Sequence, residues 1–114
     1  MLEILRKSSE EMTKKDIFLM TKNQNIKTMK SLDNGHKLTV KHWIQFTDVN
    51  GIGERVEILS IMTDDGMVVA SNSASFREMF FDIVEILEEY EGFTIEKLGG
   101  KTKAGRDFVT CALV

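Results

Sequence analysis

The longest regular pattern in this chain is an alternation of apolar and polar side chains from His36 to Asp48. A two-residue period is typical of a β-strand that buries one face and exposes the other. One face would carry Leu38, Val40, His42, Ile44 and Phe46, and the other would carry Lys37, Thr39, Lys41, Trp43, Gln45 and Thr47. The pattern predicts a long strand whose solvent face holds the chain's one tryptophan. A partly covered surface tryptophan is the alternative, because single exposed apolar residues are common.

Two apolar runs after the long strand, Arg55–Thr63 and Met67–Ala70, are joined by a turn that contains Asp65-Gly66. The Asp-Gly pair is typical of a tight hairpin, so both runs are predicted strands of one sheet. Two more predicted strands, Phe93–Leu98 and Arg106–Leu113, flank a basic loop that is rich in glycine.

The segment before the long strand permits two interpretations. Asp16–Thr21 is a short apolar run, which we interpret as the first strand, and Asp33-Asn34-Gly35 then turns the chain. Thr13 and Asp16 also have the spacing of a capping box, in which two side chains cap the start of a helix. A helix that begins at Thr13 is therefore the alternative.

One segment has clear helical periodicity. Ser75 and Glu78 have the spacing of a capping box, which predicts a helix start at Ser75. Apolar residues then recur at helical spacing, and the opposite face is mainly charged. Phe81 is the exception, because it falls on the charged face. The apolar stripe comprises Phe76, Met79, Phe80, Ile83, Val84, Ile86, Leu87 and Tyr90.

The order of these elements predicts a mostly β fold with one helix. We expect a five-stranded OB-fold barrel, with the helix between the third and fourth strands. An unrelated α+β domain with the same order is the alternative. The 114 residues contain no proline and no linker-like tract, so residues 15–114 are predicted to form one domain. Residues 1–14 are predicted to be an appended N-terminal arm, either mobile or docked through Leu2, Ile4 and Leu5.

Charge is distributed unevenly along the chain, although the net charge is only −3. Residues 72–91, which contain the predicted helix, carry six acidic residues and one basic residue, Arg77. Two zones are basic: residues 13–47 carry Lys14, Lys15, Lys22, Lys27, Lys30, Lys37 and Lys41, and the last loop region carries Lys97, Lys101, Lys103 and Arg106. An acidic protein with two basic zones can bind a polyanion locally.

The residues give little support to an enzyme, a metal site or a cofactor. His36 and His42 have no cysteine or paired carboxylates at a ligand spacing. Gly99-Gly100-Lys101-Thr102 lacks the first glycine of a phosphate-binding loop and precedes a predicted strand instead of a helix. The one cysteine, Cys111, lies in an apolar run and is predicted to be a buried thiol. We expect a protein that is not an enzyme and that uses no metal and no cofactor.

From Ile17 onward the chain resembles a family, the small single-stranded-DNA-binding proteins of phages of Gram-positive bacteria, such as lactococcal phages and protein-primed Bacillus phages. The resemblance rests on order and spacing. Its parts are the predicted strand at Ile17-Phe18, the turn Leu32-Asp33-Asn34-Gly35, the hairpin Asp65-Gly66, the helix after Ser73-Ala74-Ser75, and the ending Gly99-Gly100-Lys101-Thr102-Lys103-Ala104-Gly105. It implies an OB-fold that coats single-stranded DNA in phage DNA replication and recombination, as a homodimer in the cytoplasm of the infected bacterial cell. Replication or recombination proteins are further expected partners.

The predicted function is therefore binding of single-stranded DNA without strong sequence preference. Trp43 is expected to stack on a base, since aromatic rings beside cations suit single-stranded nucleic acids. Phe108, on the outer side of the last strand, is a second stacking candidate. The predicted phosphate contacts are Lys37, Lys41, Lys97, Lys101, Lys103 and Arg106, with Lys22, Lys27 and Lys30 extending the track.

A protein–protein module or an inhibitor of a host factor is the alternative function. Its working surface would be the acidic helix face with Phe81. For the homodimer, either Phe81 or an open barrel edge is expected to supply part of the contact. A membrane partner is not expected, because no apolar run approaches the roughly 20 residues that cross a bilayer.

Overall fold

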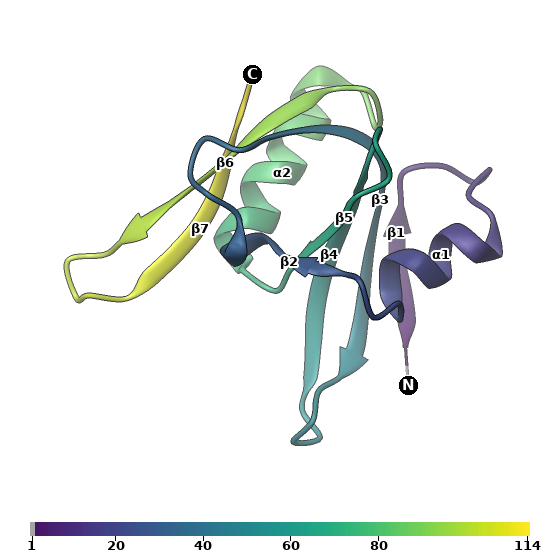
Figure 1. Ribbon diagram of the computed structural model, residues 1–114, viewed down its shortest axis with the longest axis horizontal. Helices are drawn as coiled ribbons and strands as arrows, with labels where there is room; N and C mark the ends of the chain where they lie inside the picture. Colours follow the sequence, from purple (N-terminus) through teal and green to yellow (C-terminus); the bar gives the residue numbers. More distant parts are fainter. Residues whose placement is uncertain (1) are drawn as a thin grey trace.

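A computed structural model describes residues 2–114 as one curled, open β-sheet with two α-helices (Figure 1). The strand order is β2-β5-β4-β3-β6-β7, and β1 also pairs with β3. The elements are β1 (Glu3–Lys7), α1 (Lys14–Thr21), β2 (Lys27–Thr28), the 3-10 turn η1 (Met29–Ser31), β3 (Lys37–Val49), β4 (Arg55–Thr63), β5 (Val68–Ser71), α2 (Ala74–Leu87), β6 (Thr94–Lys101) and β7 (Asp107–Leu113).

The prediction of a mostly β, barrel-like fold is confirmed at that level. β3 is central, because it pairs with β4 along one edge and with both β6 and β1 along the other. The sheet curls but stays open, with β7 at one end of the strand order and β2 at the other. The prediction of a single helix is wrong.

The extra helix is α1, and it replaces the strand predicted at Asp16–Thr21. The Thr13 hydroxyl accepts a hydrogen bond from the Asp16 N–H at 3.1 Å, and the Asp16 carboxylate accepts one from the Thr13 N–H at 3.2 Å. This reciprocal capping box satisfies donors that a helix start leaves free. The alternative interpretation of that segment is therefore the correct one.

β3 contains a bulge, and the bulge breaks the alternation on which the sequence analysis relied. Val40 pairs with Thr63, but the next pair is His42 with Met62, so β3 has one residue more than β4 over this step. The extra residue, Lys41, shifts every later side chain to the other face. Trp43 thereby joins the side of Leu38 and Val40, and it is 1% exposed. The prediction of a solvent-facing Trp43 is wrong.

Two hydrophobic cores form, one on each face of the sheet. The larger core lies under α2 and includes Trp43, Leu59, Phe76 and Phe80. The smaller core lies under α1 and includes Met20, Ile44, Phe46 and Met62. Between Trp43 and Phe46, both faces of β3 are therefore covered by a core. This differs from the predicted strand, which would expose one face to solvent.

α2 begins earlier than the capping box at Ser75 predicts. Ser73 is the N-cap, and its hydroxyl accepts from the Phe76 N–H at 3.4 Å. Phe81 is not free on the charged face, because its ring packs edge-on against Trp43 with centroids 5.2 Å apart. The Arg6 guanidinium covers the same ring at 4.6 Å. Contacts with Trp43 and Arg6 of the same chain thus explain why an apolar residue lies at this position of the helix.

Residues at the N-terminus, which we expected to form an appended arm, contribute a strand. β1 runs antiparallel to β3, with Ile4 opposite Phe46 and Lys7 opposite Ile44. Ser8 follows β1 and also contacts β3, because the Trp43 N–H in the middle of β3 donates to the Ser8 hydroxyl at 2.9 Å. No helix within residues 2–114 is long and apolar enough to cross a membrane.

Candidate functional site

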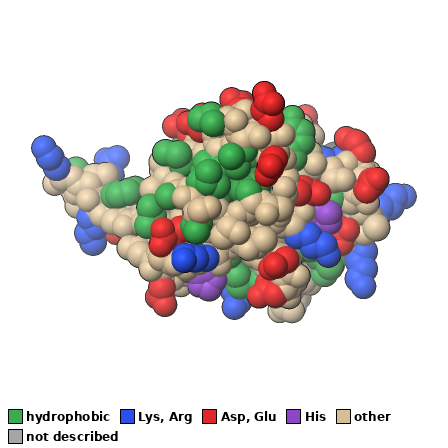
Figure 2. Space-filling view, turned by 90° about the horizontal axis from the view of Figure 1, so that it is seen from above, with side chains coloured by type: hydrophobic (Ala, Val, Ile, Leu, Met, Phe, Trp, Pro, Cys, Tyr) green, Lys and Arg blue, Asp and Glu red, His purple; other side chains and the backbone are tan. Residues whose placement is uncertain are grey.

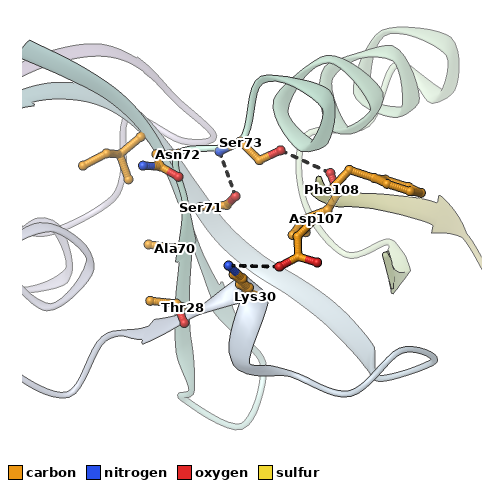
Figure 3. Close-up of a pocket in the computed structure, with 10 residues that line it drawn as sticks. Thr28, Lys30, Ala70, Ser71, Asn72, Ser73, Asp107 and Phe108 are labelled. Carbon is orange, nitrogen blue, oxygen red and sulfur yellow. Dashed lines mark hydrogen bonds and ion pairs between the residues drawn. The ribbon is translucent and has the colours of Figure 1, made fainter. Parts of the chain in front are cut away.

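A groove of about 480 Å³ lies where the curled sheet stays open, between β5 and β7 (Figure 3). We call it the central groove. It is lined by Thr28, Lys30, Ile58, Ala70, Ser71, Asn72, Ser73, Asp107, Phe108 and Val109. Strand β7 is held beside the start of α2 because the Ser73 and Ser75 hydroxyls both donate to the Val109 carbonyl, at 3.2 and 3.0 Å.

A carboxylate and two lysines lie at the mouth of the central groove. The Lys30 Nζ is 3.6 Å from one Asp107 oxygen, and the Lys101 Nζ is 3.6 Å from the other. All three side chains are at least half exposed, and exposed ion pairs of this kind contribute about 0–1 kcal/mol. A phosphate that binds both lysines would displace the Asp107 carboxylate from these weak pairs, and the carboxylate charge beside it would still oppose the phosphate.

Phe108 offers an aromatic surface on the hairpin that borders the groove. The residue is 39% exposed, and its ring lies toward the hairpin and away from the Lys30–Asp107 pair (Figure 3). Phe108 is paired across the hairpin with Gly100, and a Cβ at Gly100 would lie 3.2 Å from the ring. Because Gly100 has no side chain, the ring rests on the β6 backbone and keeps one face open.

The tip of the same hairpin is basic. Lys103 and Arg106 are exposed in the turn between β6 and β7, where the Thr102 N–H donates to the Arg106 carbonyl at 2.8 Å. A second, smaller hollow of about 300 Å³ lies at the base of the hairpin and shares Lys30, Asp107, Phe108 and Val109 with the central groove. The hairpin thus groups Lys101, Lys103, Arg106 and Phe108, as predicted from the sequence.

Polar groups inside the central groove are available for a ligand. The side chains of Thr28 and Asn72 form no hydrogen bond within residues 2–114, whereas Ser71 is engaged by the Ser73 N–H at 3.1 Å. The sequence analysis missed Thr28, Asn72 and Asp107. Only the position of Asn72, between a strand end and a helix start, and the position of Asp107 beside Phe108 could have suggested them.

Lys97 lines the smaller hollow but, unlike the other cations of this surface, it is buried. It is 6% exposed, and its Nζ donates to the Leu32 carbonyl at 2.9 Å and to the Asn34 side-chain oxygen at 3.0 Å. Alternation along β6 puts Lys97 on the same side as Ile95, which is fully buried. The prediction of Lys97 as a phosphate contact is therefore contradicted by its burial, and the β6 pattern contains the warning.

Trp43 is likewise unavailable for stacking on a base. Its ring lies edge-on to Phe80 and Tyr90 within the larger core, and its Nε1 donates to the Tyr90 carbonyl at 2.7 Å. A buried tryptophan normally satisfies its N–H in this way. Base stacking by Trp43 would require the core to open.

The other predicted lysines have different surroundings. Lys27 is exposed on β2, directly before Thr28 of the central groove. Lys22 pairs with Asp48 at the far end of β3. Lys37 and Lys41 are exposed on β3 but line none of the hollows. The structure therefore brings together Lys30, Lys101 and Phe108, places Lys27 nearby, and separates the remaining three from them.

His42, which the sequence analysis considered as a metal ligand, contacts a carboxylate, and the Cys111 thiol is buried. The His42 Nδ1 lies 2.6 Å from the Glu91 carboxylate, to which the Ser8 hydroxyl also donates at 2.7 Å. Burial raises the pKa of the Cys111 thiol to about 12, so the thiol stays protonated at neutral pH. In the described part of the chain, no three His, Cys, Asp or Glu side chains converge as a metal site.

A second surface, on α2 and at the end of the chain, exposes apolar side chains instead of basic ones. Ile86 is 82% exposed and Met79 is 41% exposed on α2, and Leu113 and Val114 are exposed at the end of the chain. Figure 2 shows hydrophobic side chains at the centre of the face seen from above, with Asp and Glu side chains around them. Lysine and arginine side chains lie on the projecting hairpin at its left.

Comparison with protein-family models, with curated proteins and with solved structures finds no match for this chain. The functional inference below therefore rests on the site itself.

Proposed function

We propose that the protein binds single-stranded DNA without strong sequence preference, along the central groove and the β6–β7 hairpin. In this proposal the process is phage DNA replication and recombination, in the cytoplasm of an infected bacterial cell, and neither catalysis nor a cofactor is involved. Phe108 stacks on a base, and Lys30, Lys101, Lys103 and Arg106 neutralise phosphates.

The observation that carries the proposal is the exposed Phe108 ring on Gly100, within a hairpin that also carries exposed cations. Stacking on an aromatic ring tolerates every base, and nearby cations follow the phosphate backbone. Duplex DNA hides its base faces, so this combination favours single strands. The net charge of −3 limits indiscriminate adhesion to polyanions elsewhere on the surface.

The topology supports a relationship to the OB-fold. β3, β4 and β5 form a meander, α2 follows, and the β6–β7 hairpin returns to β3. This is the order of an OB-fold, in which the helix separates the third strand from the fourth. β5 and β7 flank the central groove instead of pairing, and β1, α1 and β2 are additions to that plan.

The test is a fluorescence anisotropy titration of labelled oligothymidylate and of a duplex of equal length. We expect tighter binding of the single strand, and we expect Phe108→Ala to weaken it by about 1–3 kcal/mol, the usual contribution of one stacked base. Because Phe108 is outside both cores, its replacement should leave the unfolding midpoint unchanged.

Phe18→Ala is the matched control, since it removes another exposed phenylalanine ring, 55% exposed, on α1 and outside the hollows and both cores. It should leave binding unchanged. Equal affinity for single and double strands, or equal losses in both variants, would refute the proposal.

A protein–protein function is the second candidate, and the exposed α2 surface favours it. Ile86 projects into solvent at 82% exposure beside an acidic helix face. Exposed apolar side chains with a polar rim are typical of interaction sites. This version of the alternative uses Ile86 in place of Phe81, whose ring is packed against Trp43 and covered by Arg6. If Ile86→Glu abolished an activity in the phage that Phe108→Ala left intact, this candidate would be preferred.

A further inference from the structure

A third hollow lies on the far side of β2 from the central groove. It measures about 430 Å³ and is bordered by the end of α1, by the connection to β2 and by the β4–β5 turn. We call it the turn hollow. Its polar side chains are Asn23, Asn25, Lys27 and Asp65, and Leu19 supplies an apolar wall.

The turn hollow and the central groove lie on either side of β2. β2 pairs in parallel with β5, with Lys27 opposite Val69 and Thr28 opposite Ala70. Val68 lines the turn hollow and Ser71 lines the central groove, on either side of these pairs. Val68 and Ser71 are three positions apart on β5, which is about 10 Å at the usual rise per residue. β2 therefore separates two neighbouring hollows, and we call this strand the sill between them.

The chemistry of the turn hollow suits nucleotides. The side-chain amides of Asn23 and Asn25 form no hydrogen bond with another described residue, and an amide can both donate to and accept from a base edge. Lys27 is exposed at the sill, where a phosphate would pass.

One acid limits where that phosphate can pass. The Asp65 carboxylate accepts hydrogen bonds from the Thr63 hydroxyl and the Met67 N–H, and these bonds lower its pKa. Its charge on the opposite wall repels phosphate. A bound backbone would therefore pass on the Lys27 side.

We infer that the bound single strand continues from the central groove across β2 into the turn hollow, with Lys27 neutralising the phosphate at the sill and Asn23 and Asn25 contacting a base. This inference rests on the proposed function and extends it, because it defines the path and the minimum length of the DNA. A short oligonucleotide can occupy the central groove alone, whereas a longer one spans both hollows.

The test compares oligothymidylates of about 4 and about 12 nucleotides, which lie near the ends of the range for one OB domain. For the longer one, we expect Lys27→Gln to make the log–log salt dependence shallower by about 0.7, the contribution of one phosphate. For the shorter one, no change is expected. Asn25→Ala should also weaken only the longer oligonucleotide. Lys30→Gln should weaken both.

Lys15→Gln is the control, because Lys15 is an exposed α1 lysine that lines none of the hollows. Lys27 and Asn25 are exposed, so both variants should keep the wild-type unfolding midpoint. If both oligonucleotides bind but Lys27→Gln leaves the salt dependence of the longer one unchanged, the track ends at the central groove and the inference is wrong. If neither binds, the proposed function itself fails.

Discussion

Lys97 and Lys101 are four positions apart on β6, yet their surroundings assign them different roles. The Lys97 ammonium is held by the Leu32 carbonyl and the Asn34 side chain, away from solvent. Lys101 extends into solvent beside Asp107. The first lysine fastens the turn before β3 to the hairpin, and the second is free to meet a phosphate.

Lys97→Ala should therefore lower stability without changing how salt affects binding. Removing the buried ammonium eliminates its two hydrogen bonds to part-buried acceptors, at a cost of about 1–3 kcal/mol. Lys101→Ala should do the reverse. Urea denaturation and a salt titration of oligothymidylate binding measure the two effects. A shallower salt dependence in Lys97→Ala would return Lys97 to the binding surface.

Trp43 should behave as a core residue at every test. We expect Trp43→Ala to cost about 3–5 kcal/mol of unfolding free energy, the usual range for a large buried aromatic, and Trp43→Phe to cost less. The native fluorescence should be blue-shifted and resistant to acrylamide. Strong quenching by acrylamide would show that the ring is accessible after all.

At the scale of elements, the β6–β7 hairpin is the part of the chain most suited to a polyanion. It combines Phe108 with exposed cations, and only Asp107 opposes them in β7. Because the hairpin projects from the sheet, a bound strand can reach it without displacing either core (Figure 1).

Replacing Lys101, Lys103 and Arg106 together with Gln should make the salt dependence of binding markedly shallower. Each phosphate contact that is lost should reduce the log–log slope by roughly 0.7. The unfolding midpoint should stay close to that of wild type, because all of these side chains are exposed. An unchanged slope would move the binding surface away from the hairpin.

The sequence predicted the turns well from local chemistry. It favoured a strand at Asp16–Thr21, where a local capping box in fact starts α1, and it failed on β3, where tertiary contacts decide which face is buried. Gly35 and Gly66 have the positive φ values that their predicted turns require. The failure at Trp43 comes from one bulge residue, Lys41, and nothing in the residue types around it marks a bulge. A two-residue period thus gave the right element and the wrong face.

The candidate site was predictable only in part, for the same reason. The last loop was identified from its basic composition, and Phe108 from its alternation with Val109. Asp107 and Asn72 could not be connected, because the chain brings them together only when β5 and β7 curl toward each other. Long-range proximity of this kind is invisible to a local pattern.

At the scale of the whole molecule, charge separates a basic hairpin from an acidic α2 face (Figure 2). A polyanion would bind at the hairpin and be repelled from α2, which leaves α2 uncovered while DNA is bound. This arrangement also bears on the homodimer, which stays a prediction. A two-fold contact through α2 would bring Asp82 and Glu85 near their own copies, and such like charges repel.

We therefore expect a dimer that forms through a strand edge and not through α2. Light scattering should give a dimer for wild type and also for Ile86→Glu, since Ile86 is 82% exposed and outside both cores. Phe81→Glu is a poor test, because it would place a carboxylate against Trp43. A monomeric wild type at high micromolar concentration would contradict the prediction, and a monomeric Ile86→Glu would reassign the contact to α2.

β3 contributes side chains to both cores, so we expect the two cores to be thermodynamically coupled. Trp43 and Ile44 are neighbours on one strand, yet they belong to the cores under α2 and under α1 respectively. Neither core can melt without freeing the backbone that supports the other, so the chain should unfold as one cooperative unit. Denaturation followed by Trp43 fluorescence and by far-ultraviolet circular dichroism should give coincident curves. Since β3 pairs with β6 at one end and contributes Ile44 and Phe46 to the core under α1, a force applied to the β6–β7 hairpin would reach α1 through β3.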